Sequence, residues 1–482
     1  MSRTLPSVAA SAVPTPRPPS SGTSPEERRA SGRALRALAP LEAHAEFRRP
    51  RSAADPLALL LEQGAARVPD LLPIRYGRMV KTPFTYFRGA ARVMAADLSR
   101  TVRSGLAVQM GGDAHLVNFG FAGSPERRLV FDANDFDETL PGPFEYDVKR
   151  LVASLEVAGR ENGYSRKERR RIALGATARY RTAMADFAEA RDIEVWYSRV
   201  DSDQLQERLA PLLDADRRKR LARALAKTRT RDNLQAFGKL TESVDGRLRI
   251  RSDPPLVVPM RELLPESDSR EFQQGFRTLI RQYGRSLQSD RRALLERYHF
   301  VDIARKVVGV GSVGTRCWII LLTGRDDDDP LLLQVKEATD SVHAEFVGKS
   351  RYTNQGQRVV AGQRLMQQAS DMFLGWQHTT GIDGVERDFY VRQLRDWKGS
   401  LTIESLRPEG LEIYGEICAW SLARAHARSG DRIAISGYLG SSAKFDNAVA
   451  EFATTYADVN EVDHRQLADA VADGRVPANL DT

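Results

Sequence analysis

Hydrophobic and polar positions alternate at a helical period through most of the first 300 residues. In residues 83–101 one side of a single predicted helix carries Phe87, Ala91, Met94, Ala95 and Leu98. Residues 146–163 and 165–192 continue the pattern, and Ser165 is placed to cap the second of these helices. A short strand is predicted at residues 129–131, and residues 201–300 are predicted to be helices and polar connections.

The pattern changes near residue 301. Apolar and β-branched runs separated by turn residues predict strands at residues 307–308, 317–322 and 331–335. The aspartates Asp326–Asp329 predict a solvated hairpin turn, because neighbouring carboxylates repel each other. A helix over 356–376 and a strand over 387–394 follow, and the chain is helical again beyond Lys398.

Four segments follow from this reading of the chain. Residues 1–48 begin rich in Pro, Ser and Thr and are predicted to be a disordered or loosely ordered tail. Residues 49–300 form a large helical lobe, residues 301–393 a small β-rich lobe, and residues 394–482 the remainder of the helical lobe. The expected fold class is α+β, with two lobes.

Length, cysteine content and charge limit the domain organisation, location and partners to expect. A chain of 482 residues exceeds one ordinary core, which agrees with two lobes. The two cysteines, Cys317 and Cys418, exclude a disulfide framework and suit a reducing, cytoplasmic location. No apolar run approaches the roughly 18 residues of a membrane span, so no membrane partner is expected. The net charge of +8 permits an anionic partner, but arginine is spread along the whole chain, which disfavours nucleic acid.

Carboxylates crowd around two short apolar runs, "MGGDAHLVNFG" and "RLVFDANDFDET". An unpaired buried carboxylate is costly, so a core strand gains nothing from these residues. The stretch is therefore either a polar surface turn or a set of oxygen ligands for a metal and a phosphate. The side chains concerned are Asp113, Asn118, Asp132, Asp135 and Asp137.

A glycine-rich loop, "GVGSVG" (Gly309–Gly314), lies between two predicted strands. Glycines let backbone N–H groups approach phosphate oxygens closely. A dinucleotide-binding fold needs a helix directly after such a loop, but "TRCWIILL" predicts a strand. The pattern instead favours the strand–turn–strand of a protein kinase, with Lys336 of "LLLQVKEA" on the next strand. The alternative for Lys336 is a solvent-facing strand lysine.

The acidic motifs resemble those of kinase-like small-molecule phosphotransferases of the aminoglycoside and choline kinase type. "GGDAHLVN", "LVFDANDFD" and "EYDVKRL" follow the order of their catalytic loop, metal turn and helix aspartate. The resemblance implies that Asp113 is the catalytic base, that Asn118 and Asp135 hold Mg²⁺, and that Asp147 is a buried brace. Asp132 remains an alternative metal ligand because it directly follows "LVF". His115 is expected to be a hydrogen-bonded loop residue, and Asp137 either assists the metal or is solvated.

The motifs stand in the reverse of the kinase order, since the acidic loops precede the glycine loop. The helix "CAWSLARAHARSGD" resembles the one that precedes the catalytic loop in these kinases, so the chain resembles a circularly permuted form. From about Arg75 to Asp463 it is identified as a member of the bacterial family called domain of unknown function 2252, which is placed among protein-kinase-like folds.

The resemblance implies an ATP- and Mg²⁺-dependent phosphotransferase acting on a small-molecule hydroxyl or amine. The phosphates would meet the glycine loop and its lysine, and the adenine would meet the end of the last small-lobe strand. The positions implied are Gly309, Gly311, Ser312, Gly314 and Lys336 for the phosphates, and Gln393 and Leu394 for the adenine.

Two departures from the kinase pattern keep other functions open. Gly111 stands where the kinase loop commonly has histidine, and no acidic residue occurs from Phe346 to Ser370 to pair with Lys336. The candidate substitutes are Glu337, Glu345, Gln363 and Gln367. The alternatives are a nucleotide-binding, regulatory pseudokinase and an AMP transferase, followed by a basic nucleic-acid-binding protein.

Overall fold

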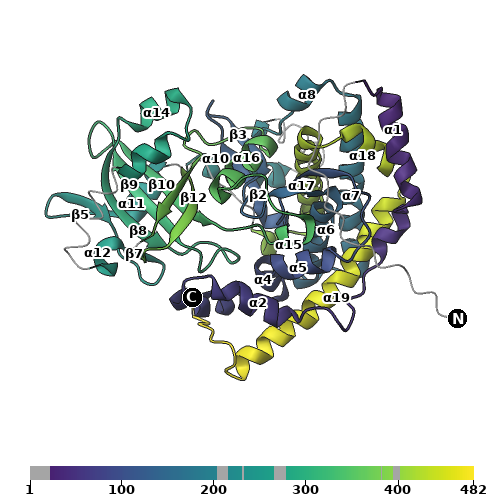
Figure 1. Cartoon of the computed structure of the whole chain (residues 1–482), viewed down its shortest axis with the longest axis horizontal. Coiled ribbons are helices and arrows are strands. Elements are labelled where there is room, and N and C mark those ends of the chain that lie inside the picture. The colour runs from purple at the N-terminus through teal and green to yellow at the C-terminus, as the bar shows by residue number, and fades with distance from the viewer. Residues whose placement is uncertain are drawn as a thin grey trace.

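The structure is a computed structural model, and it describes residues 22–203, 215–230, 233–264, 278–381, 383–394 and 402–481. It is a mixed α and β structure in which helices gather on one side and the main sheet on the other (Figure 1). Within the described residues no helix is long and apolar enough to cross a membrane.

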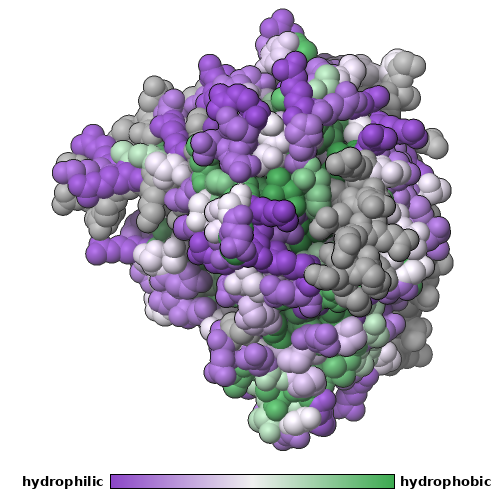
Figure 2. Space-filling model, turned by 90° about the vertical axis from the view of Figure 1, so that its left-hand side faces the viewer, coloured by the Kyte–Doolittle hydropathy of each residue, from purple (hydrophilic) through white to green (hydrophobic). Residues whose placement is uncertain are grey.

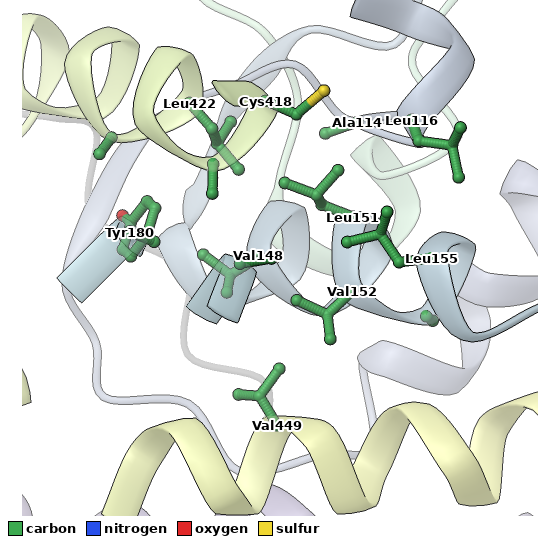
Figure 3. Packing of buried hydrophobic residues seen from close by; sticks show 14 of the residues in the cluster. Ala114, Leu116, Val148, Leu151, Val152, Leu155, Tyr180, Cys418, Leu422 and Val449 are labelled. Carbon is green, nitrogen blue, oxygen red and sulfur yellow. The ribbon is translucent and has the colours of Figure 1, made fainter. Parts of the chain in front are cut away.

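The helical part is built from both halves of the chain. Its main helices are α1 (Pro25–Ala34), α6 (Phe144–Glu161), α7 (Arg166–Glu189), α17 (Pro408–Ser429), α18 (Arg432–Leu439) and α19 (Lys444–Ala472). Figure 3 shows α6 between α17 and α19, with Val148 and Val152 near Val449 and with Leu151 and Leu155 on the side of Cys418. Apolar residues three and four apart thus bury two sides of α6.

The main sheet has six antiparallel strands in the order β11-β12-β10-β9-β8-β7. Its strands are β7 (Val257–Pro259), β8 (His299–Lys306), β9 (Cys317–Thr323), β10 (Pro330–Ala338), β11 (Gly375–Thr380) and β12 (Glu386–Gln393). Both faces of β9 are covered, because Ile320 and Leu322 belong to one apolar cluster while Ile319 and Leu321 belong to another. This explains its nearly continuous apolar sequence.

Shorter elements surround these two parts. Before α6 lie α2 (Pro56–Ala65), α3 (Leu72–Met79), α4 (Pro83–Gly89), α5 (Ala91–Leu98), β1 (Ala107–Met110), β2 (Phe119–Gly123), β3 (Leu129–Ala133) and β4 (Leu140–Pro143). After α7 lie α8 (Asp192–Tyr197), α10 (Ala215–Arg229), α11 (Asn233–Leu240), β5 (Thr241–Val244), β6 (Arg247–Ile250), α12 (Met260–Leu263), α14 (Ser289–Leu295), α15 (Ala344–Val347) and α16 (Gln355–Met366).

The segment predicted as a disordered or loosely ordered tail, residues 1–48, contains an ordered helix. Residues 1–21 lie outside the described residues, but α1 is a regular helix with a capping box at Ser24. It packs on α18, where Arg28 pairs with Asp431 at 2.7 Å and Gly32 lies against the backbone of Ala434. Tertiary packing therefore orders a polar segment that is weakly helical by composition.

Three helix and strand predictions are corrected. The single helix over 83–101 is two helices, α4 and α5, because Ala90 leaves the helical conformation with φ −105° and ψ 32°. The helix over 356–376 ends at Met366, and Gly375 already begins β11. The strand before the glycine loop is β8, so residues 307–308 follow it; its polar sequence hid it because much of the strand is only half-buried.

Several strands were not predicted at all. β1, β2 and β4 are too short to show a period, and β5 to β7 fall in the stretch predicted as helices and connections. Because β7 pairs with β8, the sheet draws in residues before the predicted boundary at 301. The solvated turn at Asp326–Asp329 is confirmed between β9 and β10, with Asp326 to Asp328 exposed.

Figure 2 shows that, seen from the sheet side, hydrophobic residues gather between hydrophilic ones.

Candidate functional site

The predicted acidic and glycine-rich loops meet at one cleft of about 530 Å³. Its lining includes Asp113, Asn118 and Asp135 from the acidic loops, together with Gly309, Gly311 and Ser312 from the glycine loop. A more apolar pocket of about 310 Å³ lies against the main sheet, but it contains none of the predicted catalytic or metal-binding residues. The larger cleft is therefore the candidate site.

The acidic loop after β1 is held by alternate residues. Ala114 and Leu116 are buried in the helical core, as Figure 3 shows, while Asp113 lines the cleft. The carboxylate of Asp147, near the start of α6, accepts hydrogen bonds from the backbone N–H groups of Gly111 (2.7 Å) and Gly112 (2.9 Å). The prediction that Asp147 braces this loop is confirmed.

A glycine is required at position 112. Its φ is +80°, and a Cβ there would lie 2.2 Å from the carbonyl oxygen of Glu138. The same aspartate that braces the loop also contacts Nε2 of His426 on α17 at 3.1 Å. The end of α17 therefore adjoins the acidic loop, although more than 270 residues of sequence separate Asp147 from His426.

Asp113 is held by an arginine. Nε and Nη2 of Arg150 on α6 donate to Oδ1 of Asp113 at 2.8 and 2.6 Å, and Arg150 also lies over the Phe87 ring. Burial opposes ionisation of Asp113, but the charge of Arg150 and its hydrogen bonds to the carboxylate outweigh burial, so the pKa of Asp113 is lowered. Asp113 is thus a fixed carboxylate suited to orienting a donor, and a weak proton acceptor.

His115 is a buried neutral residue. Its Nε2 lies 3.7 Å from Oδ2 of Asp113, and burial lowers the pKa of His115 to about 3. The sequence predicts a hydrogen-bonded loop residue rather than a metal ligand, and the backbone N–H of His115 donates within the loop to the carbonyl oxygen of Asp113 at 2.8 Å.

Asn118 and Asp135 both line the cleft, as the metal prediction requires. Nδ2 of Asn118 donates to the backbone oxygen of Asp113 at 2.9 Å, which turns the amide oxygen away from that carbonyl. Burial and the nearby charge of Asp137 raise the pKa of Asp135, a repulsion that a bound cation would relieve. Amide and carboxylate oxygens are the ligands that Mg²⁺ takes.

These donors fit Mg²⁺ carried with a phosphate ligand. Across the described ranges, no group of three His, Cys, Asp or Glu residues is arranged to hold a metal. Mg²⁺ in nucleotide enzymes usually takes only one or two carboxylates, and substrate phosphates and water complete its shell. Asn118 and Asp135 match that requirement.

Asp132, the alternative metal ligand, is engaged elsewhere. Both of its carboxylate oxygens lie 2.9 Å from Nη2 of Arg424 on α17, and both side chains are almost fully buried. The carboxylate also accepts the backbone N–H of Gln368 at 2.8 Å. Asp132 therefore joins β3 to α17 and does not line the cleft.

Lys336 lies directly beneath the cleft. Its ammonium group forms a short ion pair with Asp137 and lies 2.6 Å from Oγ of Ser312, and both partners line the cleft. The alternative of a solvent-facing lysine is wrong, since the Lys336 side chain is only 3% exposed. The charge of Asp137 outweighs burial and raises the pKa of Lys336.

The ion-pair partner of Lys336 is Asp137, and none of the four residues suggested from the sequence takes that role. Glu337 pairs with Arg316 and Arg387, Glu345 lies 3.7 Å from Arg92, and Gln363 and Gln367 bond to each other. The phenol of Tyr390, which stands opposite Lys336 on β12, donates to Asp137 at 2.7 Å. The charge of Lys336 and these bonds outweigh burial, so the pKa of Asp137 is lowered.

Three arginines pin the glycine loop. Arg67, Arg75 and Arg78 donate to the backbone oxygens of Val313 (2.5 Å), Gly311 (2.6 Å) and Gly309 (2.7 Å), respectively. Gly309 and Gly314 have φ values of +65° and +90°, which other residues rarely adopt. Gly314 itself lies against Arg67 and does not line the cleft. Hydrogen bonds from three arginines of the protein thus hold the backbone of the loop.

Gln393 and Leu394 lie apart from the cleft. They line a separate pocket of about 110 Å³ with Asn134, Gln367 and Arg392. Their backbone N–H groups already donate, from Gln393 to Asp371 at 2.5 Å and from Leu394 to Leu332 at 2.9 Å. Their contact with an adenine remains a prediction.

The arginines that organise the site were not predicted from the sequence. Arg150 follows Asp147 by three residues within the quoted "EYDVKRL", and Arg75 and Arg78 stand in "RYGRM". Only the position of Arg150, one helical turn from Asp147, gave a signal that it faces the same loop. The pairing of Arg67 with the glycine loop spans more than 240 residues and leaves no local pattern.

Glu138 predicts a pH-dependent stability. Burial raises the pKa of Glu138 to about 7, while an unfolded glutamate titrates near 4.3. Between these values the folded state binds more protons, so its unfolding free energy falls as pH rises from about 4 to 7. Glu138→Gln is expected to remove about 1 to 3 kcal/mol of that fall, measured by urea unfolding at several pH values. If the unfolding free energy depended on pH in the same way in both proteins, this prediction would be wrong.

Comparison with known proteins gives one result. A family model described as "Uncharacterized protein conserved in bacteria (DUF2252)" matches residues 67–470. No curated protein and no solved structure matches the chain. The matched residues include both acidic loops, the glycine loop, Lys336 and the three arginines that pin the loop.

Proposed function

We propose that this chain, which belongs to the DUF2252 family of uncharacterized bacterial proteins, is an ATP- and Mg²⁺-dependent phosphotransferase with a small-molecule acceptor. One observation carries the proposal. The glycine loop, Lys336, Asn118, Asp135 and Asp113 meet at a single cleft, although the acidic loops and the glycine loop lie about 200 residues apart in sequence. These are the parts that phosphoryl transfer requires.

We also propose that the fold is kinase-like and circularly permuted. In chain order, β8, the glycine loop, β9, the lysine strand β10, α16, β11 and β12 follow the sequence of elements that the kinase resemblance implies. The contact between His426 at the end of α17 and Asp147 supports the permutation. It brings the helix that would precede the catalytic loop next to that loop, despite their distance in the chain.

In this proposal each side chain has a defined task. The pinned glycine loop and the ammonium of Lys336 bind the phosphates, which compete with Asp137 for that ammonium. Asn118 and Asp135 would hold Mg²⁺, whose chemistry when bound is to neutralise phosphate charge. Asp113 accepts a hydrogen bond from the acceptor hydroxyl and aims its oxygen at the γ-phosphorus. The bond from that phosphorus to the β-phosphate oxygen breaks as the new bond forms, and the hydroxyl proton leaves through Asp113.

A second candidate is a nucleotide-binding protein that transfers nothing. The observation that favours it is the Arg150–Asp113 pair, which makes Asp113 a weak base. Both candidates require ATP to bind at Lys336, and they differ in whether Asp113 supports turnover.

Lys336→Met is expected to weaken binding of Mg²⁺ and a non-hydrolysable ATP analogue about tenfold or more, measured by isothermal titration. The reason is that the ammonium supplies a charge-assisted contact to phosphate that methionine cannot make. Lys444→Met removes an exposed lysine that pairs with Glu42 on the helical side and should bind like the wild type. Equal affinity for wild type and Lys336→Met would remove the nucleotide site from this cleft.

A further inference from the structure

One arginine of the cleft has no partner. Arg88, near the end of α4, lines the cleft together with Asp113 and His115. Its Nε atom is buried without a hydrogen-bond partner, and no ion pair or hydrogen bond joins the Arg88 guanidinium to any other residue that the structure describes. An unpaired, largely buried guanidinium is costly, so such a residue points to a ligand.

The neighbouring arginines differ in this respect. Arg67, Arg75 and Arg78 bond to the glycine loop, and Arg150 bonds to Asp113. The cleft arginine on the next helix, Arg92 of α5, pairs with Glu62 at 2.9 Å. Each of these guanidinium groups makes at least one hydrogen bond or ion pair within the protein, although Nε of Arg75 is also buried without a partner. Arg88 is thus a cation available to a ligand beside Asp113.

We propose that Arg88 binds an anionic group, a carboxylate or a phosphate, on the acceptor substrate. This inference rests on the proposed function: the acceptor hydroxyl faces Asp113 while its anionic group pairs with Arg88. The planar guanidinium presents paired N–H donors that match the two oxygens of either anion. The acceptor class is therefore a hydroxylated organic anion, unlike the cationic aminoglycosides and choline of the kinases that the sequence resembles.

The geometry also limits the acceptor to one side of the cleft. The backbone oxygen of Arg88 lies 3.1 Å from where a Cβ of Gly311 would stand, so the end of α4 adjoins the glycine loop. A group bound at Arg88 therefore lies near both the phosphate loop and Asp113. The competing possibility is that Arg88 contacts the γ-phosphate of ATP, and the experiment must separate the two.

Inorganic phosphate is the probe, titrated by isothermal calorimetry into protein saturated with Mg²⁺ and a non-hydrolysable ATP analogue. Arg88→Gln is expected to weaken phosphate binding about tenfold or more while the affinity for the analogue changes less than about twofold. Arg325→Gln, an exposed arginine in the β9–β10 turn, is the matched control and should bind both like the wild type.

Three results would overturn the inference: phosphate affinity unchanged in Arg88→Gln, no phosphate binding to wild type, or analogue affinity weakened as much as in Lys336→Met. The last would assign Arg88 to the nucleotide. If the proposed function is wrong, the titration gives a different result, because the ATP analogue then fails to bind the wild-type protein. In that case phosphate is titrated into nucleotide-free protein, where loss in Arg88→Gln but not in Lys336→Met still supports an anion site at Arg88.

Discussion

Asp113→Asn is expected to lower Mg²⁺-dependent phosphoryl transfer from ATP by about 10³-fold or more, with nucleotide binding nearly unchanged. The carboxylate is the group that would orient the acceptor hydroxyl, and asparagine keeps its shape while removing its charge. ATP consumption is measured with mixed small-molecule pools as acceptors, and the product is detected as an ATP-dependent gain in mass. Asp340→Asn, which changes another aspartate of the cleft, is the matched control.

Loss of folding must be separated from loss of chemistry. Asp113→Asn leaves the buried Arg150 without its ion pair, which is destabilising by itself. The double variant Asp113→Asn/Arg150→Gln removes that unpaired charge and should regain stability without regaining turnover. Equal rates of ATP consumption for wild type and Asp113→Asn would eliminate transfer, and would favour the nucleotide-binding alternative if the analogue still binds at Lys336.

Local motifs allowed much of the candidate site to be predicted. The spacing of Asp113, Asn118 and Asp135, and the register of Lys336 behind the glycine loop, follow from residues close together in sequence. The structure then brings these two groups to one cleft. Asp147 was predictable for the same reason, since a helix aspartate shortly after the loop can reach back to its N–H groups.

Long-range pairing could not be predicted. Lys336 takes its partner from Asp137, 199 residues away, and Arg424 reaches Asp132 across 292 residues. No periodicity encodes such contacts, because they depend on how the helical part and the sheet dock. For the same reason the sequence left Asp132 open as an alternative to Asp135, the metal ligand preferred on spacing, although of the two only Asp135 lines the cleft.

The fold was predictable where the element is long and its apolar residues form a clear period or a continuous run. α6, α7, α17 and α19 show clear helical periods, and β9 and β10 are nearly continuous apolar runs. The four-residue strands β1 and β4 are too short for a period of two to stand out. Their pairing with each other fixes the acidic loop between them, so the least predictable strands position the candidate catalytic residue.

Asp132→Ala is expected to cost about 3 to 5 kcal/mol of unfolding free energy, because it leaves Arg424 charged and buried without its partner. Asp135→Asn should cost less than about 1 kcal/mol, since neutralising Asp135 relieves its repulsion with Asp137. Urea unfolding measures the unfolding free energy of each variant. Mg²⁺-dependent binding of the ATP analogue should show the reverse order, with the larger loss in Asp135→Asn.

The double variant Asp132→Leu/Arg424→Met tests the cause of the first effect. It removes both charges of the buried pair, so it should recover most of the stability that Asp132→Ala loses. If Asp132 were instead the metal ligand, the double variant would still fail to bind Mg²⁺ with the analogue, and Asp135→Asn would bind both normally. Since Asp132 contacts Arg424 and the backbone of Gln368 rather than the cleft, we expect normal Mg²⁺-dependent binding in the double variant.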